Sequence, residues 1–177
     1  MIPLLRYWLD ICRLRAAPQD GPASAFIFGL ALTCYAMVSV LVMSGNYGIL
    51  AGTRIALTEL VLLVVCVAAL LYLQDKTARI NQTLTAITGA GSLLGIVALP
   101  LALLFTPIPG NDPLPFVISV AWLSLLLWNL VVSAHIMRHA LSTGFAVGFA
   151  VSFLYMLIST QIVTTLFPQP AGVELVR

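Results

Sequence analysis

Charge is scarce in this sequence, since only 8% of its 177 residues are Asp, Glu, Lys or Arg. Soluble domains carry about 25% charged residues, so the composition excludes an ordinary soluble fold. Hydrophobic residues make up 61% of the chain, and the mean hydropathy is +1.08. These values predict an integral membrane protein in a lipid bilayer, with almost no room for a second domain.

The motifs of catalysis and of ligand binding are also missing. The sequence contains no serine–histidine–acid set, no paired acids and no glycine-rich phosphate loop, so we expect no enzymatic activity. Cys12, Cys34 and Cys66 match no zinc, haem or redox spacing. No histidine or carboxylate stands at metal-ligand spacing either, so we expect no cofactor and no metal. No basic run indicates nucleic acid.

Five apolar runs remain, each long enough to cross a hydrocarbon core of about 30 Å as a helix. We predict an all-α fold, a polytopic helical bundle over residues 23–167. Its transmembrane helices are expected at about 23–43, 52–73, 84–105, 114–137 and 144–167. Ser44 to Gly48 predicts a short loop, and the three prolines between Thr106 and Pro113 predict a stiff turn. Residues 168–177 would form a short external tail.

The N-terminal residues 1–22 are expected to form an interfacial segment and a turn. Between Met1 and Arg15, charged residues recur on one side of a helix and apolar residues occupy the adjacent face. This pattern predicts an amphipathic helix in the headgroup plane, with Tyr7 and Trp8 as interfacial anchors. Charges interrupt the apolar run that a signal peptide needs, so we expect no cleavage.

The third span carries a stripe of small residues and is the predicted hub of the bundle. On one helical face lie Thr88, Gly91, Ser92, Gly95, Ala98 and Ala102. Such a face lets neighbouring helices approach closely in lipid. Pro100 removes a backbone donor and predicts a kink.

A second small-residue face lies on the fifth span, where Gly144 and Gly148 form a GxxxG pair. We expect this face to pack inside the molecule, against the middle span. The alternative is a homo-oligomer that uses the same face.

Orientation follows from the basic residues. Six lie on one side of the predicted spans and only Arg54 and Arg177 on the other; the six are Arg6, Arg13, Arg15, Lys76, Arg79 and Arg138. The positive-inside rule then places the N-terminus in the cytoplasm and the C-terminus outside.

Four polar residues inside the spans are candidates for chemistry. Glu59 lies in the second span beyond Arg54, and a buried charge there is costly unless it is paired. It is either a proton or cation site, or a structural carboxylate with a partner on another span. Asn129 is expected to bond between helices, and His135 lies near the inner end of the fourth span.

The inner face offers the candidate contact residues Arg6, Arg13, Arg15 and Asp20. The arginines could hold the N-terminal helix against anionic lipid, at about 1 kcal/mol each. A specific contact with a membrane or cytosolic protein is the other interpretation. In that case the planar guanidinium and Asp20 would both matter.

Asp20-Gly21-Pro22 precedes the first span, and Gly91, Gly95 and Pro100 lie in the third. With five spans and an inside N-terminus, these features resemble the Yip family of membrane proteins over residues 16–167. The resemblance implies a small bacterial relative in the inner membrane. Our leading hypothesis is a non-enzymatic membrane protein that acts as a scaffold or as an assembly or trafficking partner. The alternative is a small transporter or ion-conducting subunit that uses Glu59. We expect the polar residues of the second and fourth spans at opposite depths, which favours the scaffold.

Overall fold

The computed structural model describes residues 2–104 and 116–168, and all of its regular structure is helical. The elements are α1 (Ile2–Cys12), η1 (Pro18–Asp20), α2 (Ala25–Tyr47), α3 (Ile49–Leu73), η2 (Thr77–Arg79), α4 (Ile80–Leu104), α5 (Phe116–Ala140) and α6 (Phe145–Leu166). The prediction of an all-α bundle is confirmed. The predicted turn over 106–113 and most of the predicted tail, 169–177, lie outside the described residues.

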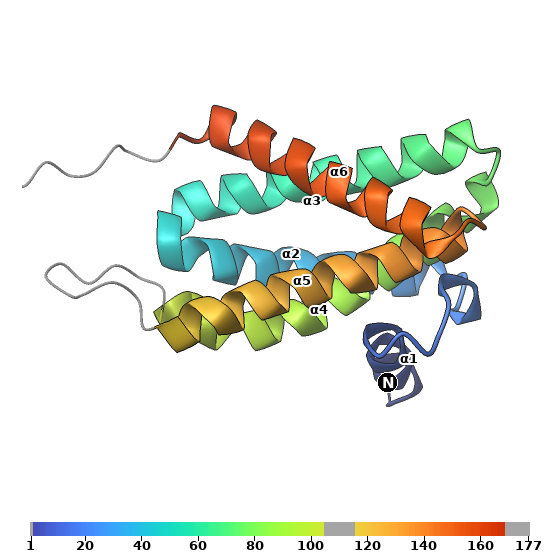
Figure 1. The fold of residues 1–177 in the computed structure, drawn as a ribbon, viewed down its shortest axis with the longest axis horizontal. Coiled ribbons are helices and arrows are strands. Elements are labelled where there is room, and N and C mark those ends of the chain that lie inside the picture. The colour runs from blue at the N-terminus through green and yellow to red at the C-terminus, as the bar shows by residue number, and fades with distance from the viewer. Residues whose placement is uncertain (1, 105–115, 169–177) are drawn as a thin grey trace, which may run out of the picture.

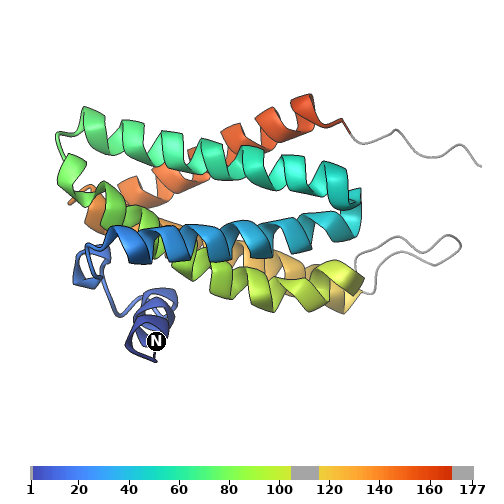
Figure 2. The same cartoon turned by 180° about the vertical axis from the view of Figure 1, so that it is seen from behind.

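Five of these helices, α2 to α6, are long and apolar enough to cross a membrane, as predicted. They run side by side in two layers, with α2, α4 and α5 in one and α3 and α6 in the other (Figures 1 and 2). The end of α6 lies at the opposite end of the bundle from α1 (Figure 1). This arrangement is the one that five crossings require.

Helix α4 is the hub of the bundle, because it contacts α1, α2, α3 and α5. Every residue from Thr83 to Ala90 is buried. Several of its hydroxyl groups bond to their own helix: Thr88 Oγ1 donates to Leu84 O and Ser92 Oγ donates to Thr88 O, both at 2.7 Å. These polar side chains are therefore satisfied without a partner on another helix. The helix continues through Pro100 to Leu104.

The expected loop from Ser44 to Gly48 is wrong. Helix α2 continues to Tyr47 and α3 begins at Ile49, so Gly48 alone reverses the chain. Its φ of 77° lies in the left-handed region, which glycine adopts without strain. On α3, a Cβ at Gly52 would lie 2.6 Å from the backbone nitrogen of Ser44, so glycine also lets the two helices meet.

The glycines of α4 face α2. A Cβ on Gly91 would lie 2.7 Å from Cε2 of Tyr35, and one on Gly95 would lie 2.5 Å from Cγ1 of Val38. Both distances are shorter than van der Waals contact. The two helices can therefore pack at this spacing only because α4 has no side chain at these two positions.

The GxxxG face of α6 packs inside the molecule, but against α5 and not against the middle span α4 as expected. A Cβ on Gly148 would collide with Ala134 O and would lie 2.8 Å from Arg138 N. Nothing lies within 4 Å of a Cβ on Gly144. The reason is local, since the short turn after Ala140 folds α6 back directly onto α5. Only Gly148 of the pair is a contact point.

Helix α1 is docked on the protein, which corrects the expectation that Tyr7 and Trp8 anchor it in the headgroups. Trp8 is 8% exposed, and its indole lies over Gly89 of α4, where any Cβ would collide with it. Ile11 is fully buried. The Tyr7 hydroxyl donates to Pro18 O at 3.2 Å. Burial and the nearby negative charge of Asp20 both raise the pKa of Tyr7.

The C-terminal end of α5 is capped by residues from other segments. Arg79 Nη1 donates to Ala140 O at 3.2 Å and to Ser142 Oγ at 2.6 Å, and Lys76 Nζ donates to Leu141 O. Gln19 Nε2 donates to His139 O at 3.0 Å. Cations at this end also complement the helix dipole. The two basic residues of the α3–α4 connection thus join the helices at one end of the bundle.

Candidate intramembrane site

A cavity of about 330 Å³ lies between α3, α4, α5 and α6. Leucine, valine, isoleucine and methionine side chains form most of its wall. Helices α5 and α6 pack tightly near their connecting turn and then diverge (Figure 1). The cavity therefore lies in the fork between two spans, within the depth that the bilayer would occupy.

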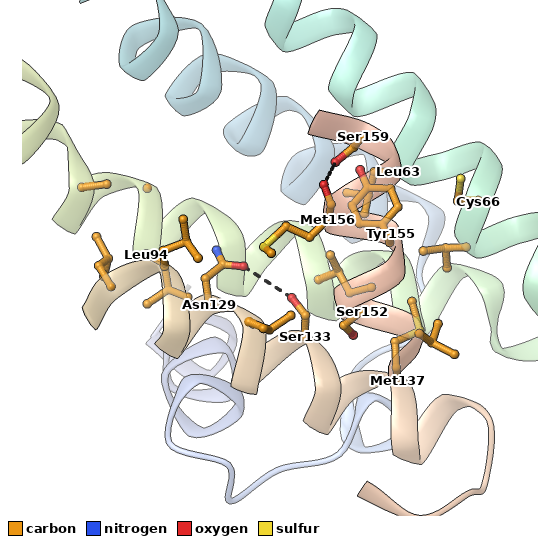
Figure 3. Close-up of a pocket in the computed structure, with 18 of the residues that line it drawn as sticks. Leu63, Cys66, Leu94, Asn129, Ser133, Met137, Ser152, Tyr155, Met156 and Ser159 are labelled. Atoms are coloured by element: carbon orange, nitrogen blue, oxygen red, sulfur yellow. Dashed lines mark hydrogen bonds between the residues drawn. The ribbon is translucent and has the colours of Figure 1, made fainter. Parts of the chain in front are cut away.

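A few polar side chains interrupt this apolar wall (Figure 3). From α5 come Asn129 and Ser133, whose Oγ donates to Asn129 Oδ1 at 3.5 Å. From α6 come Ser152, Tyr155 and Ser159. Ser159 Oγ donates to Met156 O at 3.1 Å. Ser152 differs from the others, because it is 5% exposed and its Oγ has no partner among the described residues.

A smaller cavity of about 70 Å³ adjoins the first and is lined in part by Tyr35, Asn129 and Tyr155. Tyr155 Oη donates to the backbone oxygen of Glu59 at 3.5 Å. The Glu59 carboxylate is also close enough to Tyr35 and Tyr155 to act on both hydroxyls electrostatically. Tyr155 therefore contacts the backbone of Glu59 and lines the same cavity as Asn129. The expected separation of these polar residues in depth is wrong.

Glu59 lies deeper than the predicted span suggested, because α3 begins at Ile49 and not near residue 52. Ten residues at about 1.5 Å each put it about 15 Å along the helix. Arg54 is exposed and does not act on the carboxylate. Within residues 2–104 and 116–168, the carboxylate has no ion-pair or hydrogen-bond partner; its polar neighbours are the two tyrosines.

His135 does not belong to this group. It is 3% exposed, and its Nε2 lies 2.9 Å from Ala16 O, in the segment between α1 and η1. Its ring meets that of His139 edge-on, with 4.8 Å between the centroids. His135 therefore ties the N-terminal segment to α5. In the described part of the chain, no three His, Cys, Asp or Glu side chains are placed to hold a metal ion.

The inner-face candidates divide into two kinds. Asp20 Oδ2 accepts a hydrogen bond from Ala17 N at 2.7 Å, so this carboxylate holds its own turn. Arg6, Arg13 and Arg15 are exposed. Beside Arg6 on α1 lie Leu5, 48% exposed, and Leu9, 39% exposed, and Arg13 follows in the turn after Cys12. We call Leu5, Arg6 and Leu9, together with Arg13, the outer face of α1.

Sequence reasoning missed Tyr35, Ser152 and Tyr155 as members of the site. The periodicity of α6 placed Ser152 and Tyr155 on one face, but it could not show that this face lines a cavity. Tyr35 carried no signal, because an isolated tyrosine in an apolar span is common. The spacing of Glu59 and Asn129 along the sequence likewise carries no information on which helices are neighbours.

Comparison with protein families, with curated proteins and with solved structures finds no match to this chain. A function for the protein therefore has to be inferred from the geometry of the cavity and of α1.

Proposed function

We propose that the chain is a non-enzymatic scaffold of a bacterial inner membrane, similar to the Yip family, which holds a protein partner at its cytoplasmic end. The supporting observation is that one side of α1 is buried against the bundle while the opposite side is exposed. Its inner side is fixed on α4 by Trp8 and Ile11, while its outer face stays exposed. A rigidly mounted helix with an unpartnered face of two leucines and two arginines is suited to binding another protein.

The inner end supports this proposal, because most of its other polar groups already have partners. Lys76, Arg79 and Gln19 cap α5, and His135 contacts the Ala16 carbonyl. Asp20 closes its own turn. The outer face of α1, with Arg15 beside it, is the main inner-end surface that remains available. The basic residues of this end are also the reason for placing it in the cytoplasm.

The test is a photo-crosslinking residue at Leu9, in the full chain in its native membrane. We expect a discrete protein adduct that is lost in the Arg6→Lys, Arg13→Lys double variant, because an ammonium cannot reproduce a bidentate guanidinium contact. A crosslinker at Val61, 60% exposed on α3, is the control for random encounters. Adducts with lipid alone, or adducts unchanged by the lysine variant, would mean that α1 binds only the headgroups.

Deleting residues 1–15 is a poorer test. The deletion would uncover the α4 surface under Trp8 and would remove a buried isoleucine. Losing a buried large side chain costs about 2–5 kcal/mol. A lost partner could then reflect a damaged bundle, whereas changes on the outer face leave the core intact.

A proton- or cation-conducting subunit is the second candidate function, and one observation favours it. Glu59 lies about 15 Å along its helix, beside Tyr35 and Tyr155, and both tyrosines line a cavity shared with Asn129. Intramembrane acids of this kind often carry protons. Flux measured in liposomes decides between the two. The scaffold proposal expects none, and proton flux that Glu59→Gln abolishes would establish the conducting function.

A further inference from the structure

Asn129 is a polar residue exposed at the middle of a membrane span. Helix α5 runs from Phe116 to Ala140, so this amide lies close to the centre of the helix. The other Asn and Gln residues of α2 to α6 all lie nearer to a helix end; they are Asn46, Asn81, Gln82 and Gln161. Asn129 is exposed, whereas the next residue, Leu130, is buried. At this depth the protein surface faces acyl chains, so water does not satisfy the amide.

The Asn129 side chain is only partly satisfied by its own chain. Its Oδ1 accepts a hydrogen bond from Ser133 Oγ at 3.5 Å. Its Nδ2 donates to no group among the described residues. Figure 3 shows the side chain pointing from α5 into the cavity. Because an amide without a hydrogen-bond partner is costly in hydrocarbon, Asn129 favours a partner from outside the chain.

The cavity is open to such a partner at the side of α5. Leu126, which lies about one turn from Asn129, lines the cavity and is 40% exposed. Leu125 also lines it and is partly exposed. Helix α6 diverges from α5 beyond Gly148 and leaves this part of α5 uncovered (Figure 1). The chain thus presents an amide and two leucines of one helix to the lipid.

The symmetry of a pair of identical chains identifies the occupant. The positive-inside rule gives every copy the same orientation, so two copies are related by a twofold axis along the membrane normal, and their α5 helices run parallel. Each Asn129 then lies at the same depth as its twin. A primary amide both donates and accepts, so the Nδ2 of each can bond to the Oδ1 of the other. A lipid tail has no such group, and a different protein would need a polar residue at the matching depth. We propose that two copies of the chain pair through this face of α5, with Asn129 bonded to Asn129.

Cysteine cross-linking of the full chain in its native membrane tests the pairing, after its three natural cysteines are replaced by alanine. At about 100° per residue, Leu125 lies about 40° from Asn129 around the helix and Leu127 about 160°. Leu127 is 51% exposed but does not line the cavity, so Leu127→Cys is the matched control. Disulfides form only between Cβ atoms about 4 Å apart. On oxidation, we therefore expect Leu125→Cys to give about fivefold more product of twice the chain's mass than Leu127→Cys.

Asn129→Leu tests the amide itself. The replaced side chain is exposed, so an apolar residue there suits the lipid and leaves the core intact. Dimerisation is measured in phosphatidylcholine vesicles, by energy transfer between labelled copies as added lipid dilutes the protein. We expect the variant to associate about tenfold more weakly, the equivalent of about 1.4 kcal/mol, as for other interhelical amide pairs. Gln161→Leu, which removes an exposed amide of α6 outside the cavity, should leave the association unchanged.

Three outcomes would overturn the proposal. Equal cross-linking of Leu125→Cys and Leu127→Cys would show random encounters only. An Asn129→Leu variant that associates as tightly as the parent would show that the amide is not the contact. A parent chain that stays monomeric in vesicles, or a Leu125→Cys adduct with a different protein, would show that a second copy does not cover α5. The result is independent of the partner proposed for α1, which the Leu9 crosslinker tests separately.

Discussion

Single residues determine where the helices of this bundle can pack closely against one another. Gly89 is the clearest case, because Trp8 occupies the space where any other side chain of α4 would begin. Cys12 reports on the same contact: its Sγ lies 3.8 Å from Ala90 O, and burial raises the pKa of its thiol. The thiolate is the reactive form. A docked α1 therefore keeps Cys12 less reactive at pH 8 than a free cysteine would be.

Gly89→Val should displace α1 and expose Cys12. In a background with Cys34→Ala and Cys66→Ala, the pKa of the freed thiol falls to its usual range, so alkylation at pH 8 should accelerate at least tenfold. Gly29→Val, on a helix position with nothing within 4 Å, is the control and should leave the rate unchanged. Equal rates in the two variants would contradict the docking of α1 on α4.

Arg79 joins η2 to the end of α5 through one guanidinium nitrogen. Hydrogen bonds from a charged donor contribute about 1.5–3 kcal/mol when buried, and this side chain is only partly buried. Arg79→Gln should therefore lower the free energy of unfolding by about 1–2 kcal/mol, measured by titration with a denaturing detergent. Arg13→Gln, an exposed arginine without such bonds, is the comparison. If Arg13→Gln lowered the free energy of unfolding by as much, the effect would come from the loss of positive charge and not from the hydrogen bonds of Arg79.

At the scale of the elements, neighbouring helices pack most closely at glycines, where one of the two helices has no side chain. Gly91 and Gly95 let α2 pack closely against α4. In the same way, Gly52 lets α2 approach α3, and Gly148 lets α5 approach α6. Helices in lipid gain little from burying leucine, so close backbone contact is what stabilises these pairs. The fork between α5 and α6 opens beyond the Gly148 contact, which is where the cavity begins.

Gly148→Leu should separate α5 from α6 and lower the free energy of unfolding by about 3 kcal/mol, because the new side chain collides with the backbone of α5. Gly144→Leu has open space around it and should cost less than about 1 kcal/mol. The measurement is detergent-induced unfolding followed by circular dichroism. If the two variants lowered the free energy of unfolding equally, Gly148 would not be the contact point between α5 and α6.

The sequence was sufficient to predict the elements and the hub, since apolar length and a small-residue stripe are local signals. It was not sufficient to predict which helices are neighbours. The same GxxxG pattern could face α4 or α5, and only the short α5–α6 turn decides for α5. Trp8 and Tyr7 are residue types typical of interfacial anchors. Trp8 is nevertheless buried, because Gly89, more than seventy residues away in the sequence, has no side chain and leaves room for the indole. For the same non-local reason, the sequence does not show that Tyr155 contacts the backbone of Glu59 and lines a cavity with Asn129.

At the scale of the whole molecule, the two ends of the bundle differ. One end carries α1, η1, the capped end of α5 and six of the eight basic residues. The end of α6 lies at the other, where the helices of the fork diverge (Figure 1). Binding of a cytosolic partner at α1 requires the first end to face the cytoplasm. Orientation in the membrane is therefore the claim on which the proposed function depends most.

Reporter fusions measure this orientation directly. Fusions after Gln74, Asp112, His139 and Arg177, each scored with one reporter active in the cytoplasm and one active outside, should report inside, outside, inside and outside. The reason is the six-to-two distribution of basic residues combined with five crossings. A cytoplasmic C-terminus, or an outside position for Gln74, would contradict this orientation and place α1 on the wrong side for the proposed partner.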